Sequence, residues 1–260
     1  MSLIKTPQEI DIMREGGHIL SRALKAAVDA VRPGITLREI DAIGEASVRA
    51  EGATPSFLHY KSSPSDTPFP STICLSVNEE IVHGLGNRDR VLLEGDVLGL
   101  DIGCWYKGLC TDMAVSVYVG KNPPEKIAKL LAVTKEALLA GVAAAHVGGD
   151  VKDISTAIEN VVKPHKYGNV RALVGHGVGH AVHENPNVPN YVSPQYPFVK
   201  IKDGMCLALE PMFGMGGDYR VDTADDGWAI IMADKSIGSH FEVTIAITKN
   251  GTEILTPLPV

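Results

Sequence analysis

Four acidic residues occupy matching places in two similar stretches of the chain. The segments GDVLGLD and GMCLALE each run from a glycine through apolar residues to a carboxylate, at Asp101 and at Glu210. Each is followed by a second strand-like run with another acid, TDMAVSV with Asp112 and FEVTIAI with Glu242. Acids are rarely buried unless they are paired or bound to a metal. Gathered in one hollow, these four would suit a pair of divalent cations about 3.5–4 Å apart, as in two-metal hydrolases.

The spacing of the first two acids gives a further reason to expect bound cations. If Tyr106 and Lys107 form the turn of a tight hairpin, Asp101 and Asp112 lie directly opposite each other, with Cβ atoms about 4.5–5.5 Å apart. Two ionised carboxylates at that separation repel, so a proton or a cation must compensate. The two glutamates pose the same problem in the second half of the chain. For any one acid the alternative is a solvated charge at a strand end, whereas four acids on matching faces favour a site.

Histidines offer further candidate ligands. The segment GHGVGHAVHENP contains His176, His180 and His183. The first two have the spacing of a zinc-protease helix, but the glycines disfavour a helix and the glutamate of that motif is missing. We expect a glycine-loosened strand or loop that brings one imidazole to a metal and another to a substrate. His83 lies in IVHGLG, which resembles LVGHGVG, so it is either a counterpart of the second histidine or an ordinary packing residue.

Other polar and aromatic residues are less informative. Trp228 in DDGW could be an exposed loop residue, a core residue or the wall of a pocket. The remaining acids of these segments are interpreted as loop acids and left out of the site: Asp222, Asp225, Asp226 and Glu184.

Helix signals recur in the same order in both halves. Thr6 is the predicted N-cap of a helix that Pro33-Gly34 stops, and Thr36 with Glu39 forms a capping box for a second helix to about residue 52. In the second half, residues 125–149 are predicted to be helical and Asp150 to cap the next helix. We therefore expect a single catalytic domain over residues 1–260, with halves at about 7–120 and 121–252. An old duplication explains the repetition, and two chance helix pairs are the competing explanation.

Alternation along the strands predicts which way the acids point. One face carries the four acids together with small residues: Gly99, Ala114, Ser116, Cys206, Ala208, Thr244 and Ala246. The other face carries large apolar residues: Leu98, Leu100, Met113, Val115, Val117, Leu207, Leu209, Val243, Ile245 and Ile247. The large residues require helices against them, and the small ones leave a hollow. The pattern predicts an α+β fold with a curved, mostly antiparallel sheet, helices on the outer face and a pocket inside.

Composition limits the class of protein. The chain has 260 residues, 45% of them hydrophobic, and a net charge of −7, which fits one globular domain and argues against a nucleic-acid partner. No apolar run approaches the roughly 20 residues that span a bilayer, so we expect no membrane partner. The start turns polar within five residues, which is unlike a secretory signal. The four cysteines form no CxxC pair, which predicts buried, reduced thiols and a cytoplasmic protein.

The motifs of this chain, taken together, resemble those of a known family. The set NEEIVHG, LDIG, CTDMAVS, GHGVGHAVHENP, EPMF, DGW and HFEVTIAIT, in this order over essentially the whole chain, resembles the type I methionine aminopeptidases in their short bacterial form. The resemblance implies the pita-bread fold, in which two pseudo-symmetric halves surround a dinuclear metal site. It implies removal of the initiator methionine from nascent chains whose next residue is small. The resemblance is to the short form, so we expect neither the N-terminal zinc-binding extension nor the helical insertion of other members.

The resemblance also assigns roles to residues. The five implied metal ligands are Asp101, Asp112, His176, Glu210 and Glu242. Asp112 and Glu242 would bridge two ions, and Glu210 would also be the general base. The other implied substrate contacts are the catalytic His83 and His183 and the pocket residues Phe69, Cys74 and Trp228. Four carboxylates and one imidazole suit Mn, Fe or Co as readily as Zn, so the metal identity stays open.

The chain departs from the family pattern at a few places. The segment from His59 to Cys74 is longer than usual, and Pro68 replaces a glycine that commonly precedes Phe69. Val182 replaces a larger apolar residue of the methionine pocket. None of these positions is a ligand, so the departures would act on pocket shape and selectivity.

Two other functions use the same architecture. Aminopeptidase P and prolidase share the fold and the metal set, but they usually carry a further N-terminal domain for which we expect no room here. Some pita-bread proteins are non-enzymatic binding modules, which typically lose ligands, whereas this chain keeps all five. We expect a monomer. Ribosome association would follow from the family alone, and no residue pattern indicates it.

Overall fold

The helices begin at the predicted capping residues. In the computed structural model, which describes residues 3–61 and 63–260, α1 (Pro7–Ala30) follows Thr6, whose hydroxyl accepts from the Glu9 N–H while the Glu9 carboxylate accepts from the Thr6 N–H. α2 (Leu37–Ala50) begins with the same reciprocal box, as predicted, and α4 (Val151–Val162) begins at the predicted cap Asp150, which forms a box with Asp153. α3 (Glu125–Ala144) starts without a side-chain cap and ends five residues earlier than predicted. Met1, Ser2 and Ser62, which belong to the predicted non-secretory start and to the long 59–74 segment, lie outside the described residues.

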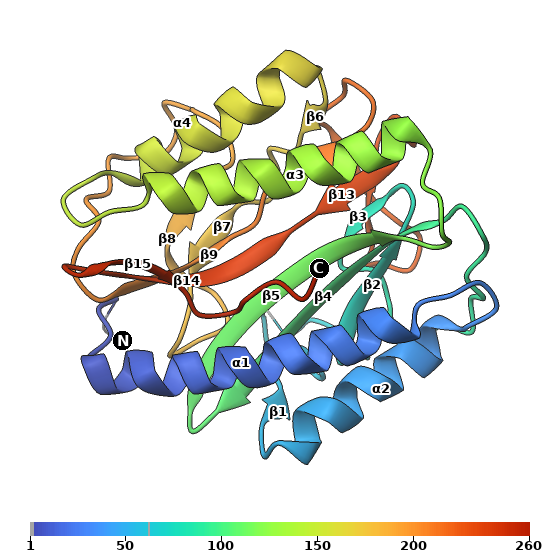
Figure 1. The fold of residues 1–260 in the computed structure, drawn as a ribbon, viewed down its shortest axis with the longest axis horizontal. Coiled ribbons are helices and arrows are strands. Elements are labelled where there is room, and N and C mark those ends of the chain that lie inside the picture. Colours follow the sequence, from blue (N-terminus) through green and yellow to red (C-terminus); the bar gives the residue numbers. More distant parts are fainter. Residues whose placement is uncertain (1–2, 62) are drawn as a thin grey trace.

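The described residues form one large sheet and two small ones. Nine strands make the large sheet, in which every pairing is antiparallel: β1 (Thr54–Pro55), β2 (Ile73–Val77), β4 (Val97–Tyr106), β5 (Leu109–Tyr118), β7 (Gly175–Gly177), β8 (Glu184–Val188), β9 (Met205–Leu209), β14 (Glu242–Thr248) and β15 (Gly251–Ile254). The small sheets contain β6 (Gly168–Asn169), β10 (Met212–Gly214) and β13 (Gly238–His240), and β3 (Glu80–Val82), β11 (Val221–Thr223) and β12 (Ile230–Met232). A short 3₁₀ helix, Lys163–His165, follows α4. Strands β5 and β14 pair at the centre of the large sheet, where the two halves of the chain meet (Figure 1).

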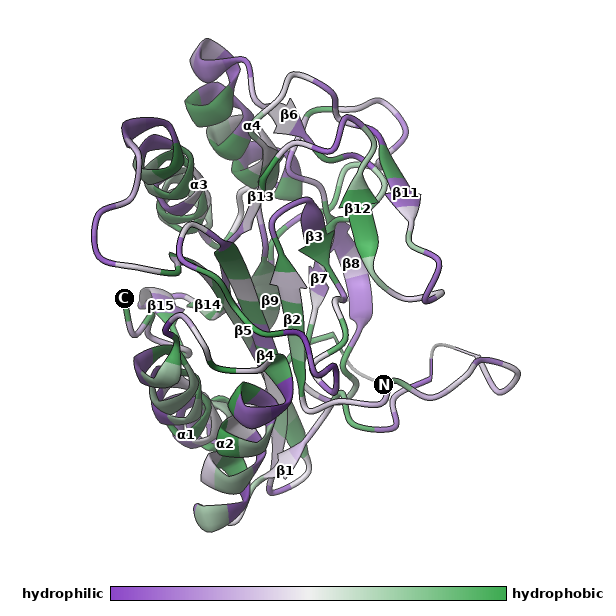
Figure 2. Ribbon diagram, turned by 90° about the vertical axis from the view of Figure 1, so that its right-hand side faces the viewer, coloured by the Kyte–Doolittle hydropathy of each residue, from purple (hydrophilic) through white to green (hydrophobic). Residues whose placement is uncertain are grey.

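The two faces of the large sheet differ as the alternation predicts. α1 packs on β4 and β5, and α3 packs on β9 and β14, so all four described helices cover one side of the sheet (Figure 2). The large apolar residues of that face form the main core with the helices, for example Leu100, Val243 and Ile245 with Leu20 and Leu138. Each such side chain stabilises the fold by about 1.5–3 kcal/mol relative to exposure. The opposite face is left for the small residues and the acids.

The predicted register of the β4–β5 hairpin is wrong. The turn is Lys107-Gly108, both with positive φ, and Tyr106 pairs with Leu109. Asp101 therefore lies opposite Ala114, and Gly103 lies opposite Asp112. Glycine at the second turn position suits the left-handed backbone of a two-residue hairpin turn, which is the signal that places the turn one residue later. The two aspartates share a face as diagonal neighbours rather than as a direct pair.

Two further expectations concern the chain as a whole. Cys74, Cys104, Cys110 and Cys206 are buried and unbridged, as predicted. None of the helices among residues 3–61 and 63–260 combines the length and apolar content that a membrane crossing requires.

Candidate active site

Strand register brings the predicted ligands into two rows across the sheet. In the first row Asp101 lies beside Ala114 on β5, and Ala114 lies beside Glu242 on β14. In the second row His176 on β7 lies beside Ala208, which pairs with Thr244, the neighbour of Asp112. Small side chains thus separate the functional ones within each row. This spacing leaves room above the sheet for a bound species that the acids and the histidine can contact together.

These rows form the floor of one cavity of about 320 Å³. It is lined by every residue that the sequence analysis assigned to the site: Phe69, Cys74, His83, Asp101, Asp112, His176, His183, Glu210, Trp228 and Glu242. Further lining residues that the sequence analysis missed are Phe57, Tyr60, Thr223, Gly227 and Ile230. Thr223 and Ile230 come from β11 and β12, so the small sheet with β3 contributes part of the cavity wall.

The four carboxylates strongly disfavour being ionised together. Burial raises the pKa of Asp101 to about 7. Burial, and then the charge of Asp101, hold the pKa of Asp112 well above its usual value. The pKa values of Glu210 and Glu242 are raised in the same way by burial and then by the other acids. Only positive charge inside the cavity would let all four acids ionise near pH 7.

Donor atoms without partners point to the same conclusion. Within the described chain, Asp101 Oδ1, Asp112 Oδ1 and Glu242 Oε1 are buried and accept no hydrogen bond. Ligand atoms of Asp112, His176 and Glu242 lie within 4.8 Å of one another. A buried acceptor without a donor is costly, and a cation satisfies several of them at once. The residues present therefore fit a divalent metal with oxygen and nitrogen ligands.

The tautomer of His176 is set by its neighbour. His176 Nδ1 lies 2.9 Å from the carbonyl oxygen of Gly177, which can only accept, so Nδ1 carries the proton. Its Nε2 therefore has a free lone pair, and it lies 3.4 Å from Glu210 Oε1. Burial lowers the pKa of His176 to about 3, which keeps the ring neutral. A neutral imidazole held by a carbonyl is the usual form of a metal-binding histidine.

The other two predicted histidines also face the cavity. The ring of His183 packs edge-on against that of His176, with centroids 4.5 Å apart, and its Nδ1 lies 2.8 Å from the Tyr60 hydroxyl. His83 has a positive φ of 59°, an uncommon conformation for a residue other than glycine. Burial lowers the pKa of His83 to about 4 and also lowers that of His183. Both rings are neutral near pH 7 and can each donate one N–H.

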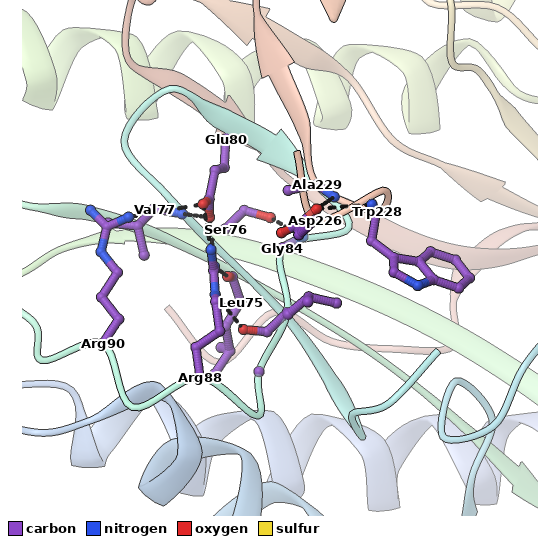
Figure 3. A network of polar contacts seen from close by, with 12 residues as sticks. Leu75, Ser76, Val77, Glu80, Gly84, Arg88, Arg90, Asp226, Trp228 and Ala229 are labelled. Atoms are coloured by element: carbon purple, nitrogen blue, oxygen red, sulfur yellow. Dashed lines mark hydrogen bonds and ion pairs between the residues drawn. The ribbon is translucent and has the colours of Figure 1, made fainter. Parts of the chain in front are cut away.

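A polar network holds the loops that carry His83 and Trp228 (Figure 3). Arg88 donates to both carboxylate oxygens of Glu80, at 2.6 and 2.7 Å, and to the Leu75 and Leu85 carbonyls. This clamp closes the segment after His83 onto β2 and β3. Asp226 accepts from the N–H groups of Trp228 and Ala229 (Figure 3). Trp228 is thereby held edge-on to Phe69, with ring centroids 5.1 Å apart, and forms a wall of the cavity.

His180, to which the resemblance assigned no role, lies outside the cavity and forms a hydrogen bond with Glu9 at 2.8 Å. Other residues differ from their predicted interpretation. Glu184 is not a loop acid: it begins β8, and its side chain is nearly buried in an ion pair with Lys5. Asp222 likewise belongs to β11. Val182 is buried in the apolar cluster beside the cavity but does not line it.

One buried histidine was overlooked. His240 is buried, and its Nε2 lies 3.8 Å from Glu242 Oε2 without a hydrogen-bond partner among the described residues. Burial lowers its pKa to about 3. The sequence SHFE could have revealed it, because a residue two positions before Glu242 faces the same side of an extended chain.

Comparisons with known proteins agree with this geometry. The model of metallopeptidase family M24 matches residues 11–249. A methionine aminopeptidase of Clostridium perfringens is 41% identical over 257 residues, which make up 98% of this chain and 99% of that protein. The crystal structure of a Thermotoga maritima methionine aminopeptidase superposes with a TM-score of 0.90 at 38% identity, covering 97% of this chain and 98% of the other. A prolidase of Pyrococcus furiosus matches with a TM-score of 0.78 at 26% identity, but only 65% of its chain is covered.

These matches extend over nearly the whole described structure. The curled antiparallel sheet with helices on its outer face is the pita-bread fold, as the sequence predicted. The chain belongs to metallopeptidase family M24 and groups with the methionine aminopeptidases of that family.

Proposed function

We propose that this protein is a metal-dependent methionine aminopeptidase, which removes the N-terminal methionine from nascent chains and peptides whose next residue is small. The observation that carries the proposal is the single cavity that gathers four buried carboxylates and three neutral histidines. Two relatives that share almost complete mutual coverage with this chain, from Clostridium perfringens and Thermotoga maritima, are methionine aminopeptidases. The preference for a small second residue rests on the family resemblance.

The ligands of the proposed metal site are Asp101, Asp112, His176, Glu210 and Glu242. The unpartnered carboxylate oxygens and the free Nε2 of His176 support this set. Two divalent ions, with Co, Mn, Fe and Zn as candidates, are the proposed complement for four acids. When bound, such ions act as Lewis acids and supply a water with a pKa lowered to about 7.

Glu210 is the proposed general base. Its carboxylate lines the cavity beside the lone pair of His176 and is surrounded by other acids that raise its affinity for a proton. A carboxylate in this environment accepts a proton from the attacking water and later delivers it to the leaving amine. That sequence of transfers returns Glu210 to its starting state after each cycle.

His83 and His183 are the proposed donors to the substrate amide. Both are neutral, and both project into the cavity from loops beside the acids. If the Tyr60 hydroxyl donates to Nδ1 of His183, Nε2 is the nitrogen that bears hydrogen and can stabilise the developing negative charge on the carbonyl oxygen.

The apolar wall is the proposed pocket for the methionine side chain. Phe69 and Trp228 pack edge-on, and Phe57 and Tyr60 lie on the same cavity surface. Burial keeps the Cys74 thiol protonated by raising its pKa, so Cys74 acts as an apolar wall residue and not as a nucleophile. A flexible thioether fits such a surface through contacts between sulfur and aromatic rings.

The remaining assignments follow from weaker observations. A single catalytic domain over residues 1–260, with halves at about 7–120 and 121–252, is proposed from the repeated helix and strand order. A monomer in the cytoplasm is proposed, and unbridged buried thiols support a reducing compartment. Ribosome association is proposed on the resemblance alone.

A peptide assay tests the proposed function. The protein is incubated with Met-Ala-Ser and with a set of Xaa-Pro peptides after chelation and again after adding back each divalent metal, and the products are identified by mass spectrometry. We expect release of methionine alone from Met-Ala-Ser, lost on chelation and restored by metal. Cleavage only of the Xaa-Pro peptides would assign the chain to the prolidase type, which the fold similarity to a prolidase makes the relevant alternative.

A further inference from the structure

A buried ion pair lies beneath the loop that carries His183. Lys5 Nζ donates to Glu184 Oε2 at 2.5 Å, and the two side chains are 0% and 7% exposed. Lysine and glutamate are almost never this buried unless each has a partner, because water solvates their charges so well. Burying both charges costs desolvation free energy, so a functional role would explain why this pair is buried.

The second carboxylate oxygen of Glu184 organises the loop directly. Glu184 Oε1 accepts from the backbone N–H of His180 at 2.5 Å and from that of Ala181 at 2.9 Å. The chain between β7 and β8 thus folds around this carboxylate. His183 lies between these backbone groups and Glu184, so its position depends on how the loop closes.

The Lys5 side chain packs directly against the loop that carries His183. Gly179 has a φ of 137°, and a Cβ at this position would overlap the Lys5 side chain, so the loop passes directly over the lysine. Gly179 also accepts from the Cys110 N–H at 2.7 Å. Lys5 is itself fixed, since its N–H donates to the Gly204 carbonyl at 2.8 Å. The lysine therefore connects the segment that leads into α1 with the loop that carries His183.

We propose that the Lys5–Glu184 ion pair is a positioning device that holds the loop of residues 178–184 so that His183 faces His176 and Tyr60. Neither Lys5 nor Glu184 lines the cavity, so the pair acts through His183 and not on the substrate. The inference rests on the proposed function of His183 in peptide hydrolysis. A pair that serves stability alone would not distinguish His183 from the other histidines of the cavity.

Kinetics in two backgrounds test the proposal. Lys5→Met is measured in the otherwise unchanged protein and in His183→Ala, with Lys107→Met as the matched control. Lys107 pairs with Glu15 at 2.8 Å on the surface, with both side chains 56% exposed. We expect Lys5→Met to lower kcat by about 10- to 100-fold with unchanged metal content. A displacement of a catalytic group by about 1 Å lowers the rate by a factor of this size. The same change should have no further effect in the His183→Ala background, and Lys107→Met should have none in either.

A second variant separates positioning from folding. Lys5→Met alone leaves a buried charge and can unfold the protein, so Lys5→Met is combined with Glu184→Gln, which removes both charges and keeps the oxygen that caps the loop. We expect the double variant to unfold at a temperature close to that of the unchanged protein and still to show a kcat at least about tenfold lower. A double variant that recovers both its stability and its kcat would overturn the proposal. So would a Lys5→Met change that lowers kcat equally in the unchanged protein and in the His183→Ala background.

Nitrogen NMR of the histidine rings gives a readout that needs no activity. In the unchanged protein His183 should show one fixed tautomer, and in the double variant its ring nitrogens should show averaged shifts while those of His176 stay unchanged. Identical His183 signals in both proteins would refute the positioning role. If the unchanged protein cleaves no Met-Ala-Ser with any metal, the proposed function is wrong, and the ring spectra still decide whether the ion pair positions His183.

Discussion

Asp112 and Thr244 exchange two hydrogen bonds across the strands that join the halves of the sheet. The Asp112 N–H donates to Thr244 Oγ1 at 3.0 Å, and the same hydroxyl donates to the Asp112 carbonyl at 2.8 Å. Ladder pairing between β5 and β14 is confined to Glu242 with Ala114 and Val243 with Met113 among the described residues. One side-chain hydroxyl therefore replaces the backbone ladder where the strands separate, and it fixes the backbone of a proposed ligand.

Replacing this hydroxyl should destabilise the protein. Thr244→Val keeps the shape of the side chain but leaves the buried N–H of Asp112 without its partner, and leaves the C=O with only the longer hydrogen bond from the Thr256 hydroxyl at 3.5 Å. We expect a loss of about 1–3 kcal/mol in the free energy of unfolding for the unsatisfied N–H. Urea unfolding measures it, and Thr244→Ser, which keeps the hydroxyl, should lose much less. Equal losses of unfolding free energy for Thr244→Val and Thr244→Ser would mean that the hydroxyl does not bridge β5 and β14.

Glu210→Gln should abolish turnover more than binding. The amide keeps the size of the side chain but cannot accept and deliver the proton, so kcat on Met-Ala-Ser should fall by about 10²- to 10⁴-fold. KM should change little, because the pocket walls are untouched. Steady-state kinetics at a fixed metal content check this, and a near-normal kcat would show that another group is the base.

His83→Ala should lower kcat while the metal content stays the same. His83 is proposed to donate to the substrate amide, and losing one such donor costs about 10²- to 10³-fold in kcat. Metal analysis by mass spectrometry after dialysis is the deciding control. A variant that loses metal together with activity would make His83 a ligand.

Asp41 should make stability depend on pH. It accepts from the Thr72 and Ile73 N–H groups, yet burial raises its pKa from 3.8 to about 6. A carboxyl whose pKa is higher in the folded state binds its proton more tightly there. The free energy of unfolding therefore decreases as pH rises from about 4 to about 6. Asp41→Asn keeps the acceptor oxygen and removes the charge.

The asparagine variant should therefore be more stable than the unchanged protein above pH 6. We expect a gain of about 2 kcal/mol there, allowing for partial screening by water, and little gain at pH 4. Thermal unfolding across pH 4–7 provides the measurement. A gain that is the same at pH 4 and pH 7 would exclude titration of Asp41 as its cause.

Local signals in the sequence were sufficient to predict where helices begin and which face of each strand packs against them. The capping boxes at Thr6, Thr36 and Asp150 depend on residues three apart, so they could be recognised without any tertiary information. Strand alternation likewise predicted that Leu100 and Val243 pack under the helices and that the acids lie on the opposite face. Both rules involve neighbours in sequence, which is why they succeeded.

Contacts between distant segments could not be predicted in the same way. Tyr60 reaches His183, and Lys5 reaches Glu184 across 179 positions, through loop conformations that no periodic pattern describes. The hairpin error has a different origin, since a shift of one residue in the turn moved the partner of Asp101 from Asp112 to Ala114. Turn chemistry at Lys107-Gly108 held the information that hydrophobic alternation lacked.

Five side chains from β4, β5, β7, β14 and the end of β9 are proposed to converge on shared divalent cations. Anomalous X-ray scattering from crystals soaked in Mn²⁺ tests it most directly, because it locates the metal without relying on activity. We predict two anomalous peaks in the cavity, within bonding distance of Asp101, Asp112, His176, Glu210 and Glu242. A cavity without a peak at saturating Mn²⁺, or peaks bound only to residues elsewhere, would contradict the account.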